Sequence, residues 1–543
     1  MISNFKKCIT KLKELRPYIG MLMLLFIIPG FKFSEEVRTG IIIFLIYTFW
    51  LFEIIPPVIT ALMPLVLFPF LHIIETKVVC ELYMNDSIIL FLGGLIASNA
   101  IQSSNLHKRA TFTFMILMNK GAPWLILGFM LNSMFLSLWI SNTVTTMLMV
   151  AVAEEILDNI RSKSVSNEPL NENKEDDFQN EAGVLQFKRI KQALMLSITY
   201  ASSIGGMGTL VSTGSNILFK EYIKEYFPGS TEITFASWII YNIPGMFLLM
   251  LSGWALVTYV VMKYNKQKEE TRDNIIKEVV YQEYVSLGIL TFQEKFLLAL
   301  GFFILITLWF RNPKYMPGWV ALFKQEEILV NDSVPIIAAV ILFFIIPVDP
   351  KHFLQSPAIL NWKLVRTNTS WEVIILIGGG FALAKGLEVS GLNKIFGSWV
   401  LKMHILPVNL MLAIIVLLTI MLTEFFNNIS VAALMLPIIT EVTLALKINP
   451  IKFFIPITLA SSYSFSLPTA SQANEIVRKA GELKVFQMVI PGICMNLIAY
   501  FLQLFFINTF GNIMFMLNEY PKWAAKRFTE FDLLKINDTY TFY

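Results

Sequence analysis

The sequence predicts an all-α polytopic membrane protein whose chain consists of two related halves. Hydrophobic residues make up 55% of the 543 residues and charged residues 15%, and the mean hydropathy is +0.63. Soluble domains carry about 25% charged residues, so this composition indicates an integral membrane protein. Long apolar stretches alternate with polar loops along the chain, and several polar motifs recur in its second half.

Eleven apolar stretches are long enough to cross a bilayer, which takes about 20 residues as a helix. We predict transmembrane helices at residues 17–33, 38–55, 57–74, 87–106, 190–210, 236–262, 292–311, 331–348, 371–391, 452–468 and 486–511. The first stretch follows five basic residues and has no small-residue cleavage site after it. We therefore interpret it as a retained helix rather than a signal peptide.

Two further segments, 123–158 and 405–446, each hold two apolar stretches with a polar cluster between them. The clusters are Ser141-Asn142-Thr143 and Asn427-Asn428-Ile429-Ser430. Amides and hydroxyls are costly to bury at membrane depth, so they persist where they coordinate a ligand or line a cavity. Non-helical backbone is tolerated there only inside the protein or beside water, and we therefore predict two re-entrant hairpins.

The polar motifs of the first half recur in the second. Asn427 follows Ser141 by 286 residues, and residues 91–108 correspond to 377–394 at the same spacing. A third pair, 213–216 and 471–474, is 258 residues apart. The missing 28 residues match the polar stretch 161–189, which we interpret as an insertion in the first half. Polar groups at corresponding points of two repeats are typical of a transporter binding site.

Loop charges favour an inverted arrangement of the two halves. With a cytoplasmic N-terminus, the basic loops at 107–109, 161–191, 263–295, 351–366 and 478–484 all lie in the cytoplasm, as the positive-inside rule requires. The first hairpin then opens from the cytoplasm and the second from outside, which is an arrangement that supports alternating access. The odd number of spans leaves the C-terminus extracellular, where Asn537 lies in a glycosylation sequon.

This topology divides the chain into seven parts. They are 1–160, the first repeat with its hairpin; 161–189, a cytoplasmic polar insertion; 190–262, the end of the first repeat with a broken helix; 263–291, a cytoplasmic linker; 292–446, the second repeat with its hairpin; 447–520, the last broken helix and final span; and 521–543, an extracellular tail. The polar segments 161–189 and 264–290 are predicted to be disordered or regulatory, or else a solvated run of charges.

Several functions are not expected. Three cysteines and four histidines are scattered along the chain, which favours neither a disulfide framework nor a metal cluster. We find no phosphate-binding loop, nucleophile elbow or zinc-protease helix in the sequence, and so predict no enzyme activity. The net charge of +4 is spread over separate loops, and we predict no nucleic-acid partner.

Four motifs resemble the divalent anion/sodium symporter family, the sodium-coupled dicarboxylate and citrate carriers that include the Indy-type proteins. They are WISNTVTT at 139–146, ASSIGGMGTL at 201–210, LIGGGFALAKG at 376–386 and TEFFNN at 423–428. The resemblance extends from about residue 15 to residue 525. It implies a homodimer with 11 transmembrane helices and two opposed hairpins, in which an elevator-type transport domain moves against a scaffold.

The resemblance also implies a set of binding residues. Sodium prefers the oxygens of hydroxyls, amides and carbonyls, which a hairpin tip exposes. The implied sodium ligands in the first half are Ser137, Ser141 and Asn142, with backbone around Ser212 to Gly214. In the second half they are Thr423 and Asn428, with backbone oxygens near Phe426 and Ala470. The implied substrate contacts are Asn142, Thr143, Thr213, Asn428, Ile429 and Ser471. Helix N-termini, the two asparagine amides and bound sodium would together attract a carboxylate anion.

We therefore expect a sodium-coupled, secondary-active importer of di- or tricarboxylates such as succinate and citrate. It would be a lipid-embedded homodimer in the plasma membrane with two or more sodium ions as co-substrates. A sulfate carrier, a proton-coupled or exchanging carrier, and a non-transporting scaffold or sensor are the alternatives.

Two departures from the family pattern motivate these alternatives. Residues 427–429 read Asn-Asn-Ile where the family has Ser-Asn-Thr, which places an apolar side chain at one expected hydroxyl. Residues 471–475 read Ser-Gln-Ala-Asn-Glu where the family tends to have Thr-Pro-Pro-Asn-Ala. Glu475 is therefore a candidate residue for the coupling ion, with pairing to Arg478 three residues later as the alternative.

Overall fold

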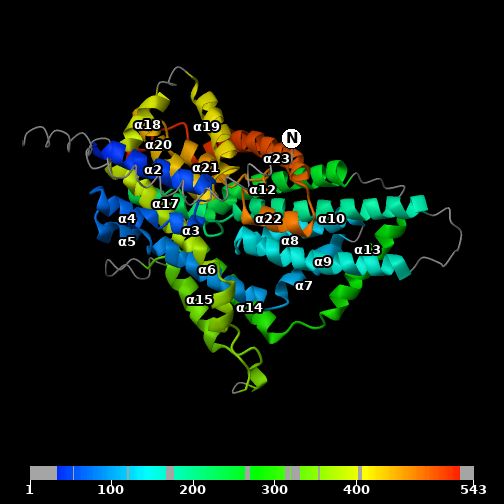
Figure 1. The fold of residues 1–543 in the computed structure, drawn as a ribbon. Helices are drawn as coiled ribbons and strands as arrows, with labels where there is room; N and C mark the ends of the chain where they lie inside the picture. Colours follow the sequence, from blue (N-terminus) through cyan, green and yellow to red (C-terminus); the bar gives the residue numbers. More distant parts are fainter. Residues whose placement is uncertain are drawn as a thin grey trace, which may run out of the picture.

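The computed structural model describes residues 33–52, 54–118, 121–166, 177–262, 270–311, 318–319, 330–352, 355–401 and 406–525. Over these residues the chain is helical, with one isolated β-bridge between Pro347 and Ala358 (Figure 1). The first predicted span, except for its last residue, and the predicted glycosylation site Asn537 lie outside the described residues.

The other predicted spans coincide with helices, several of them interrupted. These helices are α2 (Glu35–Phe52), α3 (Pro57–Thr60) with α4 (Met63–Phe70), α6 (Asp86–Gln102), α10 (Asp177–Gly206), α12 (Phe235–Ala255) with η2 (Leu256–Val261), α14 (Phe292–Trp309), α15 (Ser333–Ile345), α17 (Trp371–Val389), α21 (Ile451–Ala460), and α23 (Val485–Phe506) with η7 (Ile507–Gly511) and α24 (Asn512–Phe515).

Shorter helices connect these elements. They are α5 (Thr76–Leu82), α7 (Leu106–Met118), α11 (Gly214–Tyr226), α13 (Glu270–Ser286), η5 (Pro350–His352), α16 (Trp362–Asn368), α18 (Leu392–Leu401) and α22 (Gln472–Ala480). Each predicted hairpin is a pair of helices joined by a turn of four residues: α8 (Ala122–Ser137) with α9 (Asn142–Ser166), and α19 (Val408–Thr423) with α20 (Asn428–Ala445).

Among the described residues, five helical stretches are long and apolar enough to cross a membrane. They are Thr76–Gln102, Phe235–Val261, Phe292–Trp309, Asn428–Ala445 and Val485–Phe515. Several predicted spans are shorter because their helices break inside the apolar stretch. The predicted span 452–468 is an example, since α21 ends at Ala460 and a non-helical segment follows.

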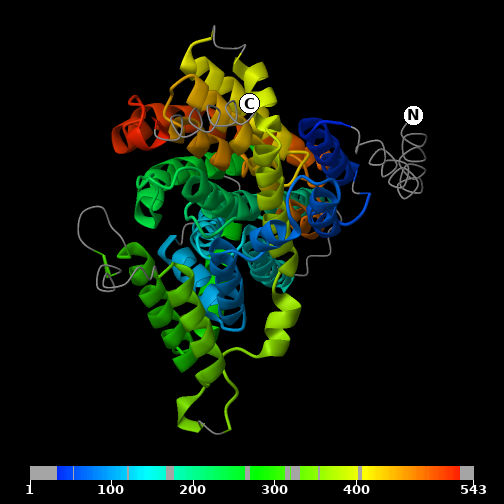
Figure 2. The same cartoon turned by 90° about the vertical axis from the view of Figure 1, so that its left-hand side faces the viewer.

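The helices of the two hairpins lie at different ends of the molecule. Figure 1 shows α8, α9 and α10 side by side, with α18, α19 and α20 gathered at the far end. Figure 2 shows α14 and α15 projecting away from the α18–α20 end, where α15 packs on α6.

Residues Glu270–Ser286 of the predicted linker form helix α13, so the prediction of a disordered segment at 264–290 was wrong for these residues, while 264–269 lie outside the described part of the chain. Helix α13 buries Ile276, Val279 and Val280, which follow the i, i+3, i+4 spacing of one helical face. It packs against α7 and α9. Two polar contacts, Lys163–Glu278 at 3.0 Å and Asn159–Glu283 at 2.7 Å, join it to α9. At the insertion 161–189, α9 continues to Ser166 and α10 already begins at Asp177.

A single arginine holds the joint between α13 and α14. Arg109 of α7 donates to the carbonyl oxygens of Gly288 at 2.8 Å and Leu287 at 3.0 Å, and pairs with the buried Glu294 at 3.3 Å. Gly288 has φ +61°, a left-handed conformation that favours glycine. The linker is thus attached to α9 along its length and to α7 at its end.

Candidate functional site

Four helices begin at the predicted polar clusters. Helices α9 and α20 start at Asn142 and Asn428, directly after the hairpin turns. Helices α11 and α22 start at Gly214 and Gln472, after the non-helical segments 207–213 and 461–471, which we call break 1 and break 2. The first N–H groups of a helix lack intrahelical partners and carry partial positive charge, so each start can bind an anion.

Each hairpin tip contains the same kind of hydrogen bond. Ser137 Oγ donates to Asn142 Oδ1 at 2.9 Å, and Thr423 Oγ1 donates to Asn428 Oδ1 at 3.1 Å. In each tip the partners are five residues apart, and the second pair follows the first by 286 residues, the spacing predicted from the sequence.

The same pattern of hydrogen bonds also occurs in each of the two breaks. Asn216 Nδ2 donates to the carbonyl oxygens of Gly206 (3.2 Å) and Thr209 (2.8 Å). Asn474 Nδ2 donates to those of Ser464 (2.8 Å) and Leu467 (2.9 Å). Each asparagine thus reaches the residues ten and seven positions before it, and the two sets are 258 residues apart. Side-chain amides replace the missing helical hydrogen bonds of each break.

Tight contacts bring the tips and breaks together. A Cβ on Gly206 would lie 2.0 Å from Asn142 Oδ1, so the tip of the first hairpin rests on the end of α10. A Cβ on Gly214 would lie 2.5 Å from Ile429 Cδ1, so the tip of the second hairpin rests on the start of α11. Ser215 Oγ lies 3.3 Å from Ser462 Oγ and joins α11 to break 2.

Comparison with known proteins places the chain in a family. The model of the sodium:sulfate symporter transmembrane region matches residues 11–517. The chain belongs to this family. It is 33% identical to the Na(+)/citrate cotransporter of Mus musculus, over 96% of this chain and 99% of that one. It is 31% identical to the human Na(+)/dicarboxylate cotransporter 3, over 93% and 92%, and 31% identical to the human solute carrier family 13 member 1, over 92% and 94%.

In this symporter chain, the ligands predicted for the first sodium ion lie around the tip of the first hairpin. Ser137 is buried and bonded to Asn142, while Ser141 Oγ is buried without a hydrogen-bond partner among the described residues. Ser212 was predicted to contribute its backbone; the single proton of its Oγ is shared between the carbonyl oxygens of Thr209 (3.0 Å) and Gly206. An unpaired buried hydroxyl oxygen such as that of Ser141 fits a cation ligand.

The predicted substrate residues of the first half lie beside these ligands. Thr213 is the residue before α11, and its Oγ1 lies 3.3 Å from Ser215 Oγ. Gly214 begins α11, and Thr143 is the second residue of α9, partly exposed next to Asn142.

The ligands predicted for the second sodium ion lie around the other tip. Thr423 Oγ1 donates to the carbonyl oxygen of Ser461 as well as to Asn428. Phe426 lies in the hairpin turn, and its ring contacts Tyr47 edge-on at 5.5 Å. Ala470 is buried at the end of break 2. Next to it, Ser471 Oγ accepts from the backbone N–H of Asn474 at 3.2 Å and caps α22.

Ile429 fills space rather than presenting a polar group. It is 6% exposed and lies between the start of α11 and α17, where it is the nearest side chain to hypothetical Cβ atoms on Gly214 and Gly380. At the spacing of 286 residues Ile429 replaces Thr143 and Asn427 replaces Ser141, so the second tip lacks both of these hydroxyls.

Glu475 forms an ion pair with Arg478, which was the alternative to a role in binding the coupling ion. Arg478 donates Nε to Oε2 and a terminal nitrogen to Oε1, both at 2.7 Å, and Lys479 lies 3.5 Å from Oε1. The side chain of Glu475 is 36% exposed.

We expect Glu475→Ala to leave the sodium and pH dependence of uptake unchanged, because Arg478 occupies both carboxylate oxygens. An exposed pair of this kind contributes about 0.2–1 kcal/mol to folding, so the surface amount should change little. Uptake measured across sodium concentration and pH, with Arg478→Ala as the matched variant, checks this. A shifted sodium profile in Glu475→Ala alone would identify Glu475 as a coupling-ion residue.

Some residues that shape the site were not predicted. Thr209 Oγ1 donates to the carbonyl oxygen of Leu138 at 2.7 Å and attaches break 1 to the first hairpin turn. Trp238 Nε1 of α12 donates to the carbonyl oxygen of Met207 in the same break at 3.0 Å. Thr209 belongs to a motif that carried the resemblance, whereas nothing in the sequence around Trp238 indicates its partner.

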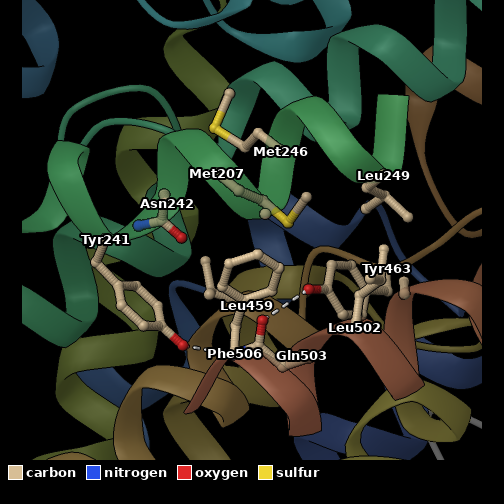
Figure 3. A pocket seen from close by; sticks show the side chains of 12 residues that line it. Met207, Tyr241, Asn242, Met246, Leu249, Leu459, Tyr463, Leu502, Gln503 and Phe506 are labelled. Atoms are coloured by element: carbon tan, nitrogen blue, oxygen red, sulfur yellow. Dashed lines mark hydrogen bonds between the residues drawn. The ribbon is translucent and has the colours of Figure 1, made fainter. Parts of the chain in front are cut away.

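A pocket lies next to both breaks, between α12 and α23 (Figure 3). Met207 of break 1 and Tyr463 of break 2 contribute to its lining. Tyr463 donates to Gln503 Oε1 at 3.1 Å, and Gln503 Nε2 donates to the hydroxyl of Tyr241 at 3.5 Å. None of the predicted ligands lines this pocket, so it is separate from the predicted binding site.

Proposed function

We propose that the chain is a secondary-active, sodium-coupled carrier that imports di- or tricarboxylates. One observation carries the proposal: two hairpin tips and two helix breaks, with matching hydrogen bonds, meet in pairs at a cluster of uncharged oxygen and N–H groups. The names of the mouse citrate and human dicarboxylate cotransporters support sodium and a carboxylate as the ligands.

The site can bind an anion without a basic side chain. The first N–H groups of α9, α11, α20 and α22 and the amides of Asn142 and Asn428 can donate to carboxylate oxygens. The hydroxyls of Ser141 and Thr423 and nearby carbonyl oxygens can coordinate sodium. Sodium would then supply the positive charge that a dianion needs, and this mutual requirement would couple the two ligands.

We further propose that transport proceeds by an elevator motion, in which the hairpins and broken helices move together against the remaining helices. Such a motion must release contacts of α11 with α6 and α15. Ser87 of α6 donates to Glu221 at 2.6 Å, and Lys220 pairs with Asp332 before α15. Lys220 and Glu221 are partly exposed, but Ser87 (1%) and Asp332 (7%) are buried, so the motion must bring these two groups into water or to new polar partners.

Sulfate is the second candidate substrate. Ile429 leaves the second tip with fewer donors, which suits a smaller dianion, and the matching family model is described as a sodium:sulfate symporter.

Uptake of labelled succinate, citrate and sulfate into cells, with choline replacing sodium, tests the proposal. We expect sodium-dependent uptake of a carboxylate. Sodium-dependent uptake of sulfate alone would favour the second candidate, uptake that persists in choline and follows pH would favour proton coupling, and no uptake at all would favour a non-transporting scaffold.

We propose that the functional protein is a homodimer in the plasma membrane with a cytoplasmic N-terminus and an extracellular C-terminus. An epitope placed after Tyr543 should therefore be stained on intact cells. An epitope before Met1 serves as the control and should be stained only after permeabilisation. Staining of both epitopes only after permeabilisation would contradict the odd number of spans and the inverted repeat.

A further inference from the structure

A buried carboxylate lies in the turn of the second hairpin, and three N–H groups of the described part of the chain bind it. Glu424 Oε1 accepts from the backbone N–H of Ser466 at 2.9 Å and from Asn496 Nδ2 at 2.6 Å, and Oε2 accepts from the backbone N–H of Leu467 at 2.9 Å. Glu424 is 8% exposed, and within the described residues its partners are these N–H groups rather than a basic side chain. Snorkelling or a scaffold ion pair, which are common roles for an acid near a helix end, therefore do not describe it.

The carboxylate binds Ser466 and Leu467 of break 2, and other groups hold the same stretch of backbone. Asn474 Nδ2 donates to the carbonyl oxygens of Ser464 and Leu467, and Asn496 Nδ2 also donates to Ser466 Oγ at 3.0 Å. Leu467 is thus held at both its N–H and its carbonyl group. A Cβ on Gly492 would lie 2.3 Å from the Cα of Ser466, so α23 packs directly on this backbone.

Glu424 is adjacent in sequence to Thr423, a predicted sodium ligand. Thr423 Oγ1 donates to the carbonyl oxygen of Ser461 at the start of break 2 and to Asn428 Oδ1. The hairpin turn and break 2 are therefore joined at two places, by a hydroxyl at one residue and by a carboxylate at the next. Ala470, another predicted ligand, follows three residues after Leu467.

The first half makes the corresponding joint without an acid. Leu138 corresponds to Glu424 at the spacing of 286 residues, and Thr209 corresponds to Leu467 at the spacing of 258. There, Thr209 Oγ1 donates to the carbonyl oxygen of Leu138. The hairpin fold thus does not require a carboxylate at this point. The carboxylate is a feature of the joint with break 2 alone among these two joints.

We propose that Glu424 is a positioning residue for the second sodium site. By binding two successive N–H groups it fixes the backbone of break 2 relative to Thr423 and Asn428, so that hydroxyl, amide and carbonyl oxygens converge on one cation. Its negative charge next to the site also favours that cation. This inference rests on the proposed sodium-coupled function.

The variant Glu424→Gln tests the proposal. Glutamine keeps the size but offers one acceptor oxygen to three donors and turns an amide N–H₂ toward a backbone N–H. We expect the sodium concentration for half-maximal uptake to rise about fivefold or more, because buried donors lose their charged acceptor. Maximal uptake at saturating sodium and the surface amount should change much less. Glu372→Gln, an exposed glutamate on α17, is the matched control and should keep the parental sodium dependence.

A second readout separates this inference from the proposed function. Sodium that binds the folded protein raises its melting temperature in detergent, whether or not an anion is transported. Purified Glu424→Gln should need several-fold more sodium than the parent for the same shift, with choline as the control salt. If the parent responds to sodium but takes up no anion, the proposed function fails while the inference still stands on the thermal shift.

A second, milder variant tests the proposal if Glu424→Gln fails to fold. If Glu424→Gln does not reach the surface, Asn496→Ala removes one donor to the carboxylate and the bond to Ser466, and should raise the half-maximal sodium concentration in the same direction. Parental sodium dependence in Glu424→Gln, or in Asn496→Ala where it replaces that variant, overturns the proposal.

Discussion

Replacing Asn142 with alanine is expected to abolish sodium-dependent uptake while the protein still reaches the cell surface. Asn142 Oδ1 accepts from Ser137 Oγ and lies against Gly206, at the point where the first hairpin meets break 1. In the proposed site its amide serves both sodium and substrate, so no other group replaces it. Alanine is a good residue for the start of α9, and the half-buried position leaves only a small void, so folding should be nearly normal.

Uptake per molecule of surface-biotinylated protein measures this effect. Asn274→Ala, on the exposed side of α13, is the matched control and should behave as the parent. Parental sodium-dependent uptake in Asn142→Ala would show that this tip is not the binding site.

The substitution Gly206→Ala, which adds one methyl group, is expected to reduce sodium-dependent uptake nearly as much as Asn142→Ala. The added Cβ would lie 2.0 Å from Asn142 Oδ1 and 2.8 Å from its Cγ, so the amide must leave its place. We expect uptake to fall by about tenfold or more, because a shift of about 1 Å in a binding group can cost about a hundredfold in rate. Uptake normalised to surface amount again provides the measurement.

The chain offers a clean control for the added methyl group. Gly94 lies in the middle of α6, and a Cβ there would meet nothing within 4 Å. Gly94→Ala should keep parental uptake, and alanine at a helix interior is favoured over glycine by about 1 kcal/mol. Equal uptake by Gly206→Ala and Gly94→Ala would mean that Asn142 can move without loss of function.

Hydropathy and motif spacing predicted the apolar helices and both hairpin tips. The spacing of 286 residues placed Ser137 and Asn142 opposite Thr423 and Asn428, and the structure gives the two pairs the same hydrogen bond. This worked because a short polar cluster inside an apolar stretch is a local signal that does not depend on which helices pack together.

Other features depend on partners that no local pattern reveals. The helix ending at Ala460 was predicted to continue, because apolar residues between the serines of 461–466 keep the hydropathy high although the backbone has left the helix. Glu424 is bound by backbone N–H groups about 42 residues away, which composition cannot indicate. Helix α13 was missed because its three buried residues form only a narrow stripe within a charged segment.

Helix α13, in the described part of the linker, contacts both the first hairpin and α7. Helix α13 is fastened to the hairpin arm α9 through Lys163 and Asn159, and its far end is fastened to α7 through Arg109. If the hairpin moves relative to α7 and carries α13 with it, the Arg109 joint and the packing of α13 on α7 must break. If it leaves α13 behind, the Lys163 and Asn159 contacts and the packing of α13 on α9 must break. The proposed elevator motion is therefore limited by the attachment of α13 that must break. Cross-linking α13 to α9 or to α7 shows which of the two attachments this is.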